Sequence, residues 1–185
     1  ALGQVNSYTW DANRLTSAMN ALGELTTLTY ESVSNAGNRL KTVTNALGET
    51  TSFTYDSGRI RSSMDPLGQL VTAVYNGSGQ KTAYISALGH ATSFTYNSAN
   101  QVTSVQNALG ELTSQIYDSG GHRMAEVDPL GNRTSFVYNA ASQVIGVQNP
   151  LGYLTTFTLD DMNRVLAVEN ALGQRLSHTY DLNGQ

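Results

Sequence analysis

A Leu-Gly pair returns along the whole chain at nearly constant intervals, and this periodicity constrains the fold more than any other feature. A period held over the full length is typical of repeat proteins, in which each repeat packs on its neighbours instead of surrounding its own core. Cutting before each Ala/Pro-Leu-Gly divides the 185 residues into nine repeats, most of them 21 residues long. The repeats begin at residues 1, 21, 46, 66, 87, 108, 129, 150 and 171. Because the ninth repeat is cut short, we expect residues 1–185 to be a single array and a fragment of a longer chain.

The repeat from Ala87 to Asn107, ALGHATSFTYNSANQVTSVQN, serves as the type. In its first half Phe94 and Tyr96 fall on one face of an extended chain, and Ser93 and Thr95 fall on the other. Period-two alternation of aromatic and β-branched residues indicates a strand. The aromatic pattern returns as Tyr8/Trp10, Leu28/Tyr30, Phe53/Tyr55, Phe136/Tyr138 and Phe157/Leu159, with weaker copies at Ala73/Tyr75, Gln115/Tyr117 and His178/Tyr180.

Turn residues follow each predicted strand. In a type I turn, Asp or Asn at the first place bonds the following backbone amides, and Gly or Asn at the fourth accepts a positive φ. The stretches Asp118–Gly121 (DSGG) and Asp181–Gly184 (DLNG) fit this pattern, as do the NALG and DPLG stretches that join repeats. Repeats one and three are one residue shorter here (DANR and DSGR), which indicates a two-residue hairpin loop. A four-residue insertion within ESVSNAGNRL of repeat two falls at the same tip, where extra length is tolerated.

The second half of the repeat predicts a less regular strand. In QVTSVQ, Val102 and Val105 lie three residues apart, so strict alternation would send them to opposite faces. Either a β-bulge or burial of both faces would resolve the conflict. In repeat six (GHRMAEVD) the apolar residues move by one position, which predicts a local change of register.

Composition excludes several classes of partner. Charged residues make up 13% of the chain and the net charge is −4. Lys41, Lys81 and the scattered arginines form no basic tract, so the chain lacks the clustered cations that nucleic acids require. The absence of cysteine removes disulfides, zinc–thiolate sites and thiol nucleophiles. No apolar run reaches the ~18 residues that span a bilayer, so we expect no membrane span.

Strand, turn, strand, turn in every repeat predicts an all-β fold: a continuous antiparallel meander of about eight or nine β-hairpin repeats. Helix is disfavoured, since Gly and β-branched residues recur throughout. Two strands per repeat give about 17 strands, and twisted open sheets seldom exceed ~10 without curling. We therefore expect the strip to curl into a spiral shell, a barrel wall or a tube.

These repeats resemble the YD repeats of the Rhs (rearrangement hotspot) family, which is related to the shell subunits of insecticidal toxin complexes and to the teneurin YD barrel. The clearest copies are TYDSGRIRSSMDPLG (Thr54–Gly68) and IYDSGGHRMAEVDPLG (Ile116–Gly131). The resemblance covers the whole chain and implies a strip of β-hairpins spiralling into a hollow shell, which in bacterial members encloses a C-terminal toxin. The Tyr-Asp pair itself is partly replaced, by Trp10 and Leu159 for Tyr and by Glu31, Asn76, Asn97 and Asn139 for Asp.

No arrangement of residues points to catalysis, and we predict no catalytic, cofactor-binding or metal site. The carboxylates that follow the aromatic residue occur singly and are often replaced by Asn, which favours turn capping over a calcium ladder. His90, His122 and His178 occupy different places in their repeats and lack metal-ligand spacing. The GSG stretch (Gly77–Gly79) fits a turn. The aromatic rows would stack on sugars if exposed, but packing of the sheet face is the favoured interpretation.

Three hypotheses for function follow. The favoured one is a structural, non-enzymatic segment of a hollow β-shell that encapsulates a C-terminal toxin or effector domain, in contact with neighbouring repeats of the same chain. The alternatives are a cell-surface adhesion or carbohydrate-binding repeat, whose partners are surface glycans, and a self-assembling extracellular tube or fibre. No cofactor is expected. The resemblance implies a secreted or bacterial cell-surface location.

Overall fold

The computed structural model describes residues 5–33 and 37–181, and in this part of the chain every regular element is a β-strand. The chain divides between Thr92 and Ser93 into two compact halves. The first half contains β1 (Ser7–Asp11), β2 (Arg14–Met19), β3 (Leu25–Val33), β4 (Gly37–Thr44), β5 (Thr50–Asp56), β6 (Arg59–Met64), β7 (Leu70–Tyr75) and β8 (Lys81–Ile85). The boundary falls within β9 (Ala91–Tyr96). The second half continues with β10 (Val102–Gln106), β11 (Leu112–Tyr117), β12 (Arg123–Val127), β13 (Arg133–Tyr138), β14 (Val144–Gln148), β15 (Leu154–Leu159), β16 (Val165–Glu169) and β17 (Arg175–Ser177).

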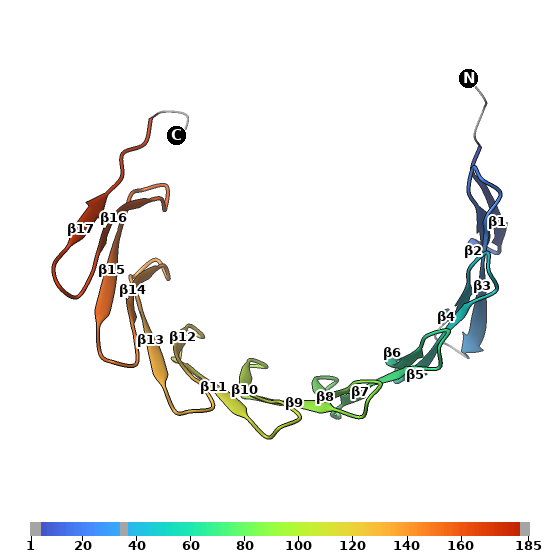
Figure 1. The fold of residues 1–185 in the computed structure, drawn as a ribbon, viewed down its shortest axis with the longest axis horizontal. Helices are drawn as coiled ribbons and strands as arrows, with labels where there is room; N and C mark the ends of the chain where they lie inside the picture. The colour runs from blue at the N-terminus through green and yellow to red at the C-terminus, as the bar shows by residue number, and fades with distance from the viewer. Residues whose placement is uncertain (1–4, 34–36, 182–185) are drawn as a thin grey trace. The chain divides into compact units, whose positions relative to one another are not determined.

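Within each half, consecutive strands pair antiparallel and the chain runs as a meander of hairpins (Figure 1). The two strands of a hairpin pair over four to seven residues, whereas strands of adjacent hairpins pair over three. The link between hairpins is therefore the shorter of the two ladders. The predicted all-β antiparallel meander is confirmed, and the hairpins coincide with the sequence repeats.

A β-bulge lies at the same place in each described hairpin. In the type repeat, Tyr96 pairs with Val102 and Phe94 with Val105, so Thr103 is the extra residue and both valines lie on one face. The register shifts fall between Thr9/Trp10, Thr29/Tyr30, Thr54/Tyr55, Val74/Tyr75, Val102/Ser104, Ile116/Tyr117, Val137/Tyr138 and Thr158/Leu159. Of the two explanations for the valine spacing, the bulge is the one observed.

The predicted change of register in repeat six is wrong. Its bulge lies between Ile116 and Tyr117, as in the other repeats, and the ladder continues unchanged. The side chains differ instead, because Glu126 stands opposite Gln115 where the type repeat has Val105 opposite Phe94. Glu126 accepts a 2.7 Å hydrogen bond from Arg123, so a polar pair replaces an apolar pair without moving the backbone.

The two faces of the meander differ in side-chain size. One, which we call the tyrosine face, carries the pairs of the type Phe94–Val105 and Tyr96–Val102. The other, the hydroxyl face, has a row of small residues just after each bulge: Ser17, Thr42, Ser62, Ala83, Ser104, Ala125, Gly146 and Ala167. Ala125 and Ala167, at 0% and 2% exposure, are the buried apolar side chains of the described residues.

The residue opposite each small residue follows a simple rule. Where it is Thr, the small residue is usually Ser or Thr and the two hydroxyl groups hydrogen-bond, as in Thr29–Thr42 and Thr54–Ser62, both at 2.6 Å. Where it is Val74, Ile116 or Val137, the small residue is Ala or Gly. Cross-strand pairs of either kind stabilise a sheet locally, so each repeat keeps a compact pair at this point.

The predicted turns are confirmed between repeats and at the described hairpin tips. In NALG and DPLG the Gly amide donates to the carbonyl of the first residue, as Gly48 does to Asn45 and Gly68 to Asp65, both at 3.0 Å. These glycines have φ of 80° and 78°. The short tips of repeats one and three are two-residue loops with positive φ at both residues, which gives type I′ turns.

The insertion in repeat two lengthens the hairpin. Three additional pairs, Glu31–Arg39, Ser32–Asn38 and Val33–Gly37, extend the ladder of β3 and β4 beyond Tyr30. The predicted loop tip itself, residues 34–36, lies outside the described residues. The bulge between Thr29 and Tyr30 keeps its place, so the added residues leave the rest of the repeat in register.

Ser142 provides a first test of the turn geometry. It occupies the fourth place of the β13–β14 tip with φ +63°, where Gly79 and Gly121 stand in other repeats. A non-glycine residue in the left-handed backbone conformation is destabilised by about 1–2 kcal/mol. Glycine avoids this strain but loses more conformational entropy on folding, which offsets part of the gain. We expect Ser142→Gly to raise the free energy of unfolding by about 0.5 kcal/mol, measured by urea titration. The reciprocal Gly131→Ser, at φ +84° with open space around the added Cβ, should lower it; equal effects of both changes would contradict this account.

Candidate functional site

The tyrosine of the Tyr-Asp motif joins each hairpin to the one before it. Tyr55 Oη in β5 donates a 2.6 Å hydrogen bond to the carbonyl oxygen of Leu40 in β4, 15 residues earlier. Six tyrosines of the described residues make this bond at the same spacing: Tyr30 to Leu15, Tyr55 to Leu40, Tyr75 to Ile60, Tyr117 to Val102, Tyr138 to Arg123 and Tyr180 to Val165. We call this arrangement the tyrosine clamp.

The bulge explains why a side chain is needed at this point. Adjacent hairpins pair only near the turn that joins them, as Thr42–Ser52, Val43–Thr51 and Thr44–Thr50 do. Beyond these pairs, the Leu40 carbonyl lies next to the bulge and outside the inter-hairpin ladder. A buried carbonyl without a partner costs free energy, and Leu40 is half-buried. The Tyr55 hydroxyl supplies the donor that the neighbouring backbone does not.

A cation covers the ring of several clamp tyrosines. The guanidinium carbon of Arg39 lies 5.5 Å from the Tyr55 ring centroid, 16 residues further on. The same spacing holds for Arg14–Tyr30 at 5.6 Å, Arg59–Tyr75 at 5.7 Å and Arg164–Tyr180 at 4.5 Å. Such cation–π contacts contribute about 0.5–1 kcal/mol each when exposed. In these repeats, both the hydroxyl group and the ring of the tyrosine contact the preceding repeat.

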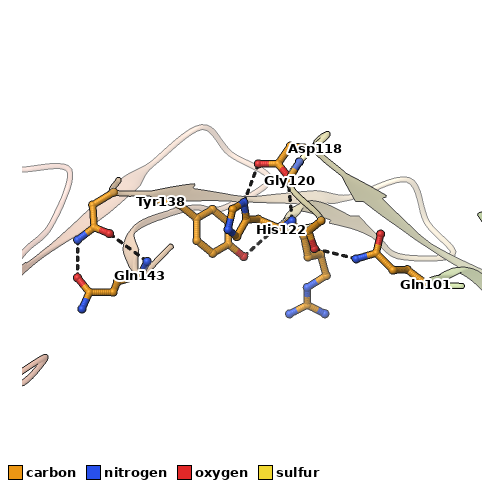
Figure 2. A network of polar contacts seen from close by, with 9 residues as sticks. Gln101, Asp118, Gly120, His122, Tyr138 and Gln143 are labelled. Atoms are coloured by element: carbon orange, nitrogen blue, oxygen red, sulfur yellow. Dashed lines mark hydrogen bonds and ion pairs between the residues drawn. The ribbon is translucent and has the colours of Figure 1, made fainter. Parts of the chain in front are cut away.

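His122 takes the place of the arginine in repeat six. Figure 2 shows its ring between Asp118 and Tyr138, with ring centroids 4.9 Å apart for His122 and Tyr138. His122 Nδ1 lies 2.9 Å from Asp118 Oδ2. In repeat five the residue at this place is Gln101, whose amide donates to the Gly121 carbonyl at 2.8 Å (Figure 2). Each of these side chains therefore reaches across to the next hairpin.

The Asp of the Tyr-Asp motif has two tasks. Asp118 Oδ1 accepts from the backbone amides of Gly120 and His122 at 2.9 and 2.8 Å, which caps the turn. Its other oxygen contacts His122, the side chain that lies against the next clamp tyrosine. Asp160 likewise accepts a 2.7 Å hydrogen bond from Arg164 Nε. The hydrogen bond from the His122 side chain is the main reason why the pKa of Asp118 lies below its usual value. For Asp160 the backbone amide of Arg164 is the main cause of the lowered pKa.

The turn-capping interpretation of the carboxylate row is confirmed for Asp118 and Asp160, and Asn76, Asn97 and Asn139 accept the same two backbone hydrogen bonds. Glu31 differs, since it pairs with Arg39 inside the lengthened hairpin. Within residues 5–33 and 37–181 no group of three His, Cys, Asp or Glu side chains comes together as a metal site. The same residues contain no helix long and apolar enough to cross a membrane.

The other residues singled out in the sequence lie apart from one another. His90 follows a turn in which its backbone amide donates to Ser86 Oγ at 3.2 Å, and the His178 amide donates to the Leu166 carbonyl at 2.8 Å. The GSG stretch is the predicted turn, capped by Asn76. The role of His122 was not predicted from the sequence. Its signal was its place: it stands four residues after Asp118, as Arg164 stands four residues after Asp160.

The turn that begins at Asp128 should be sensitive to acid. Its side chain accepts from the Leu130 and Asn132 amides and from Asn132 Nδ2, and this last bond is the main cause of its lowered pKa. A pKa lower in the folded than in the unfolded state contributes stability above the unfolded value of about 4, and this stability is lost as the pH falls through the folded value.

We therefore expect Asp128→Asn to keep the turn, as Asn45 does between repeats two and three, and to lose less stability on acidification than the parent. Urea titrations at pH 6 and pH 3 test this. A parent and variant with parallel pH dependence would contradict it, and Asp161→Asn serves as a control because Asp161 lies exposed beside a cap and not at one.

Comparison with known proteins places this repeat in a family. The model of the teneurin YD-shell matches residues 62–184, more than half of the chain. The chain belongs to the teneurin YD-shell family. No curated protein sequence matches it. The matched region contains both partners of three observed tyrosine clamps, those of Tyr117, Tyr138 and Tyr180, so the clamp is a feature of a YD-shell segment.

Solved structures show the same fold. A crystal structure of TcdB2-TccC3-Cdc42 aligns with a TM-score of 0.75 over 97% of this chain at 14% identity. A crystal structure of TcdB2-TccC3 aligns with a TM-score of 0.74 over 95% at 13% identity. The Tc holotoxin pore of Photorhabdus luminescens aligns with a TM-score of 0.54 over 89% at 15% identity. The YD-shell chain spans 11% of the length of each of these proteins.

Proposed function

We propose that the chain is a structural, non-enzymatic part of the wall of a hollow β-shell that encloses a C-terminal toxin or effector domain. The observation that carries this proposal is the match to the teneurin YD-shell family over residues 62–184. The fold shared with TcdB2-TccC3 structures supports it. In this proposal residues 1–185 form one array within a longer, secreted or surface-located protein.

The clamp suits a wall better than a binding surface. Six tyrosines direct their hydroxyl groups to backbone carbonyls of the preceding repeat, and four have an arginine over the ring. A sugar that stacked on such a ring would have to displace the cation. The carbohydrate-binding alternative therefore gains no support from this face. Links between successive repeats are what a thin wall requires, because a single-layer sheet has little core of its own.

Protection of the enclosed domain tests the proposal. In the full-length parent protein, the segment after the repeats should be resistant to protease while the shell is intact. Combining Tyr55→Ala with Tyr117→Ala should open the wall and raise the cleavage rate at least tenfold, whereas Ser119→Ala, at an exposed turn position, should not. Cleavage of that segment in the parent as fast as in the isolated segment would refute encapsulation, and so would a parent protein that ends with the repeats.

A further inference from the structure

His122 belongs to a row of residues that meet the tyrosine of the next repeat, and it differs from the others in that its charge depends on pH. The row consists of the residues that stand 16 places before the tyrosine of the next Tyr-Asp motif or before its replacement: Arg14, Arg39, Arg59, Gln80, Gln101, His122, Gln143 and Arg164. Arginine is always charged and glutamine never is, whereas histidine changes its charge between pH 5 and 8. Within the described repeats, the junction at His122 is therefore the one where the charge of this row depends on pH.

His122 contacts both hairpins of its junction, and both belong to the second half of the chain. Its Nδ1 lies 2.9 Å from Asp118 Oδ2 at the tip of the hairpin β11–β12. Its ring lies against Tyr138 of the hairpin β13–β14, with the centroids 4.9 Å apart and the planes tilted by 33° (Figure 2). Tyr138 in turn donates the clamp hydrogen bond to the Arg123 carbonyl at 3.1 Å. Asp118 and Tyr138 are thus the titratable groups in contact with the imidazole.

The other charges near this junction are paired or lie far along the strands. Arg123, the next residue, donates a 2.7 Å hydrogen bond to Glu126 on its own strand. The hairpins on either side are neutral, because residues 91–110 and 134–152 contain no Asp, Glu, Lys, Arg or His. The remaining charged residues of the three hairpins stand at the opposite ends of the strands: Glu111, Asp128 and Arg133. The charge of the imidazole is therefore balanced mainly by Asp118.

We propose that His122 is a proton-controlled link between the hairpins β11–β12 and β13–β14. When it is protonated, the ring presents a cation to Tyr138, as Arg164 does to Tyr180 at 4.5 Å. The same proton makes the hydrogen bond to Asp118 a charge-assisted one, which is stronger than its neutral counterpart. The neutral ring keeps its stacking contact but loses both electrostatic attractions. The link is therefore tighter in mild acid than in mild alkali.

Asp118 sets the lower limit of the pH range in which the link is tight. The hydrogen bond from the His122 side chain is the main cause of the lowered pKa of Asp118, so the carboxylate stays ionised while histidine takes up its proton. A carboxyl group with a lowered pKa contributes stability above its unfolded value of about 4, and this stability is lost as the pH falls through the folded value. The contribution of the imidazolium has the opposite sign, because it is lost as the pH rises. We expect the tightest link between about pH 4 and pH 6.

Hydrogen exchange of the 185-residue chain at pH 5.5 and pH 8 tests the proposal, with each rate divided into the intrinsic rate at the same pH. Protection factors of the amides in β12 and β13 should fall about fivefold between the two pH values, the size expected for one cation–π contact and the charge on one hydrogen bond. The amides of β4 and β5 supply an internal control. There the ring of Tyr55 is covered by Arg39, which keeps its charge at both pH values, so their protection should not change.

Two substitutions that other repeats already carry separate the charge from the shape of the side chain. His122→Arg should give the high protection at both pH values. His122→Gln should give the low protection at both, and Gln101 shows that a repeat with glutamine at this place folds. Asp118→Asn keeps the two capping bonds, as Asn97 does, and should reduce the pH effect without abolishing it.

Two results would overturn the proposal. One is equal protection of β12 and β13 in the parent at pH 5.5 and pH 8, because the link would then not respond to the proton. The other is a pH dependence that persists unchanged in His122→Arg, because the titrating group would then lie elsewhere, for example at His90 or His178.

Discussion

Replacing Tyr55 by alanine should lower the free energy of unfolding by about 2 kcal/mol, and replacing it by phenylalanine should lower it by about 1 kcal/mol. The alanine variant loses the half-buried ring, the contact with Arg39 and the hydrogen bond to Leu40. The phenylalanine variant keeps the ring and loses only the hydroxyl, which leaves the Leu40 carbonyl without its donor. Urea titration gives the global effect, and hydrogen exchange should show the largest loss of protection at the junction of β4 and β5.

Tyr153 provides the matched control for this experiment. It is 55% exposed and lies just after a turn, outside the clamp. Tyr153→Ala should therefore change stability by no more than about 0.5 kcal/mol, the usual range for exposed positions. If Tyr153→Ala cost as much as Tyr55→Ala, or if the phenylalanine variant were as stable as the parent, the clamp would not be a link between repeats.

Enlarging Ala125 should be the second strongly destabilising change. Ala125 is fully buried and stands opposite Ile116 on the hydroxyl face. Ala125→Leu forces extra methyl groups into this pair, and overpacking of this kind costs about 1–3 kcal/mol. Thermal and urea unfolding of the variant should both show the loss.

A double variant separates crowding from other effects. Ile116→Ala makes room opposite position 125, so combining it with Ala125→Leu should recover at least about 1 kcal/mol relative to the sum of the two single changes. Purely additive effects would show that the two side chains do not compete for the same space. The pairing rule along the small-residue row would then lack a physical basis at this hairpin.

Much of the fold could be predicted from local patterns. Alternation of Phe94 and Tyr96 placed both on one face, and the Asx and Gly positions located the turns. The bulge appeared only as one of two explanations for the Val102–Val105 spacing, because alternation cannot separate an extra residue from a second buried face. The register of repeat six was predicted wrongly because Glu126 and Gln115 changed together, which moved the apolar pattern while the backbone stayed in place.

The tyrosine clamp could not be predicted in the same way. A bond from Tyr55 to the Leu40 carbonyl leaves no trace in side-chain pattern, since any residue supplies a carbonyl. The arginine and the tyrosine that lie in contact are 16 residues apart and belong to successive repeats. The contact between them therefore cannot be seen in the pattern of a single repeat. The repeated Leu-Gly pair was visible in the sequence, but the exposure of its leucines depends on the turn, which places them outward.

Repeat two indicates where such a strip accommodates new material. Its hairpin grew by whole residue pairs beyond Tyr30, and the tyrosine still reaches Leu15 at 2.8 Å. Growth at this margin leaves the bulge and the clamp in place, since the added pairs lie beyond Tyr30, on the far side of the bulge from the pairs that join adjacent hairpins. Peptides inserted there in multiples of two residues should lengthen the hairpin beyond the edge of the sheet. With an odd number of inserted residues, the extra residue should be accommodated in the loop.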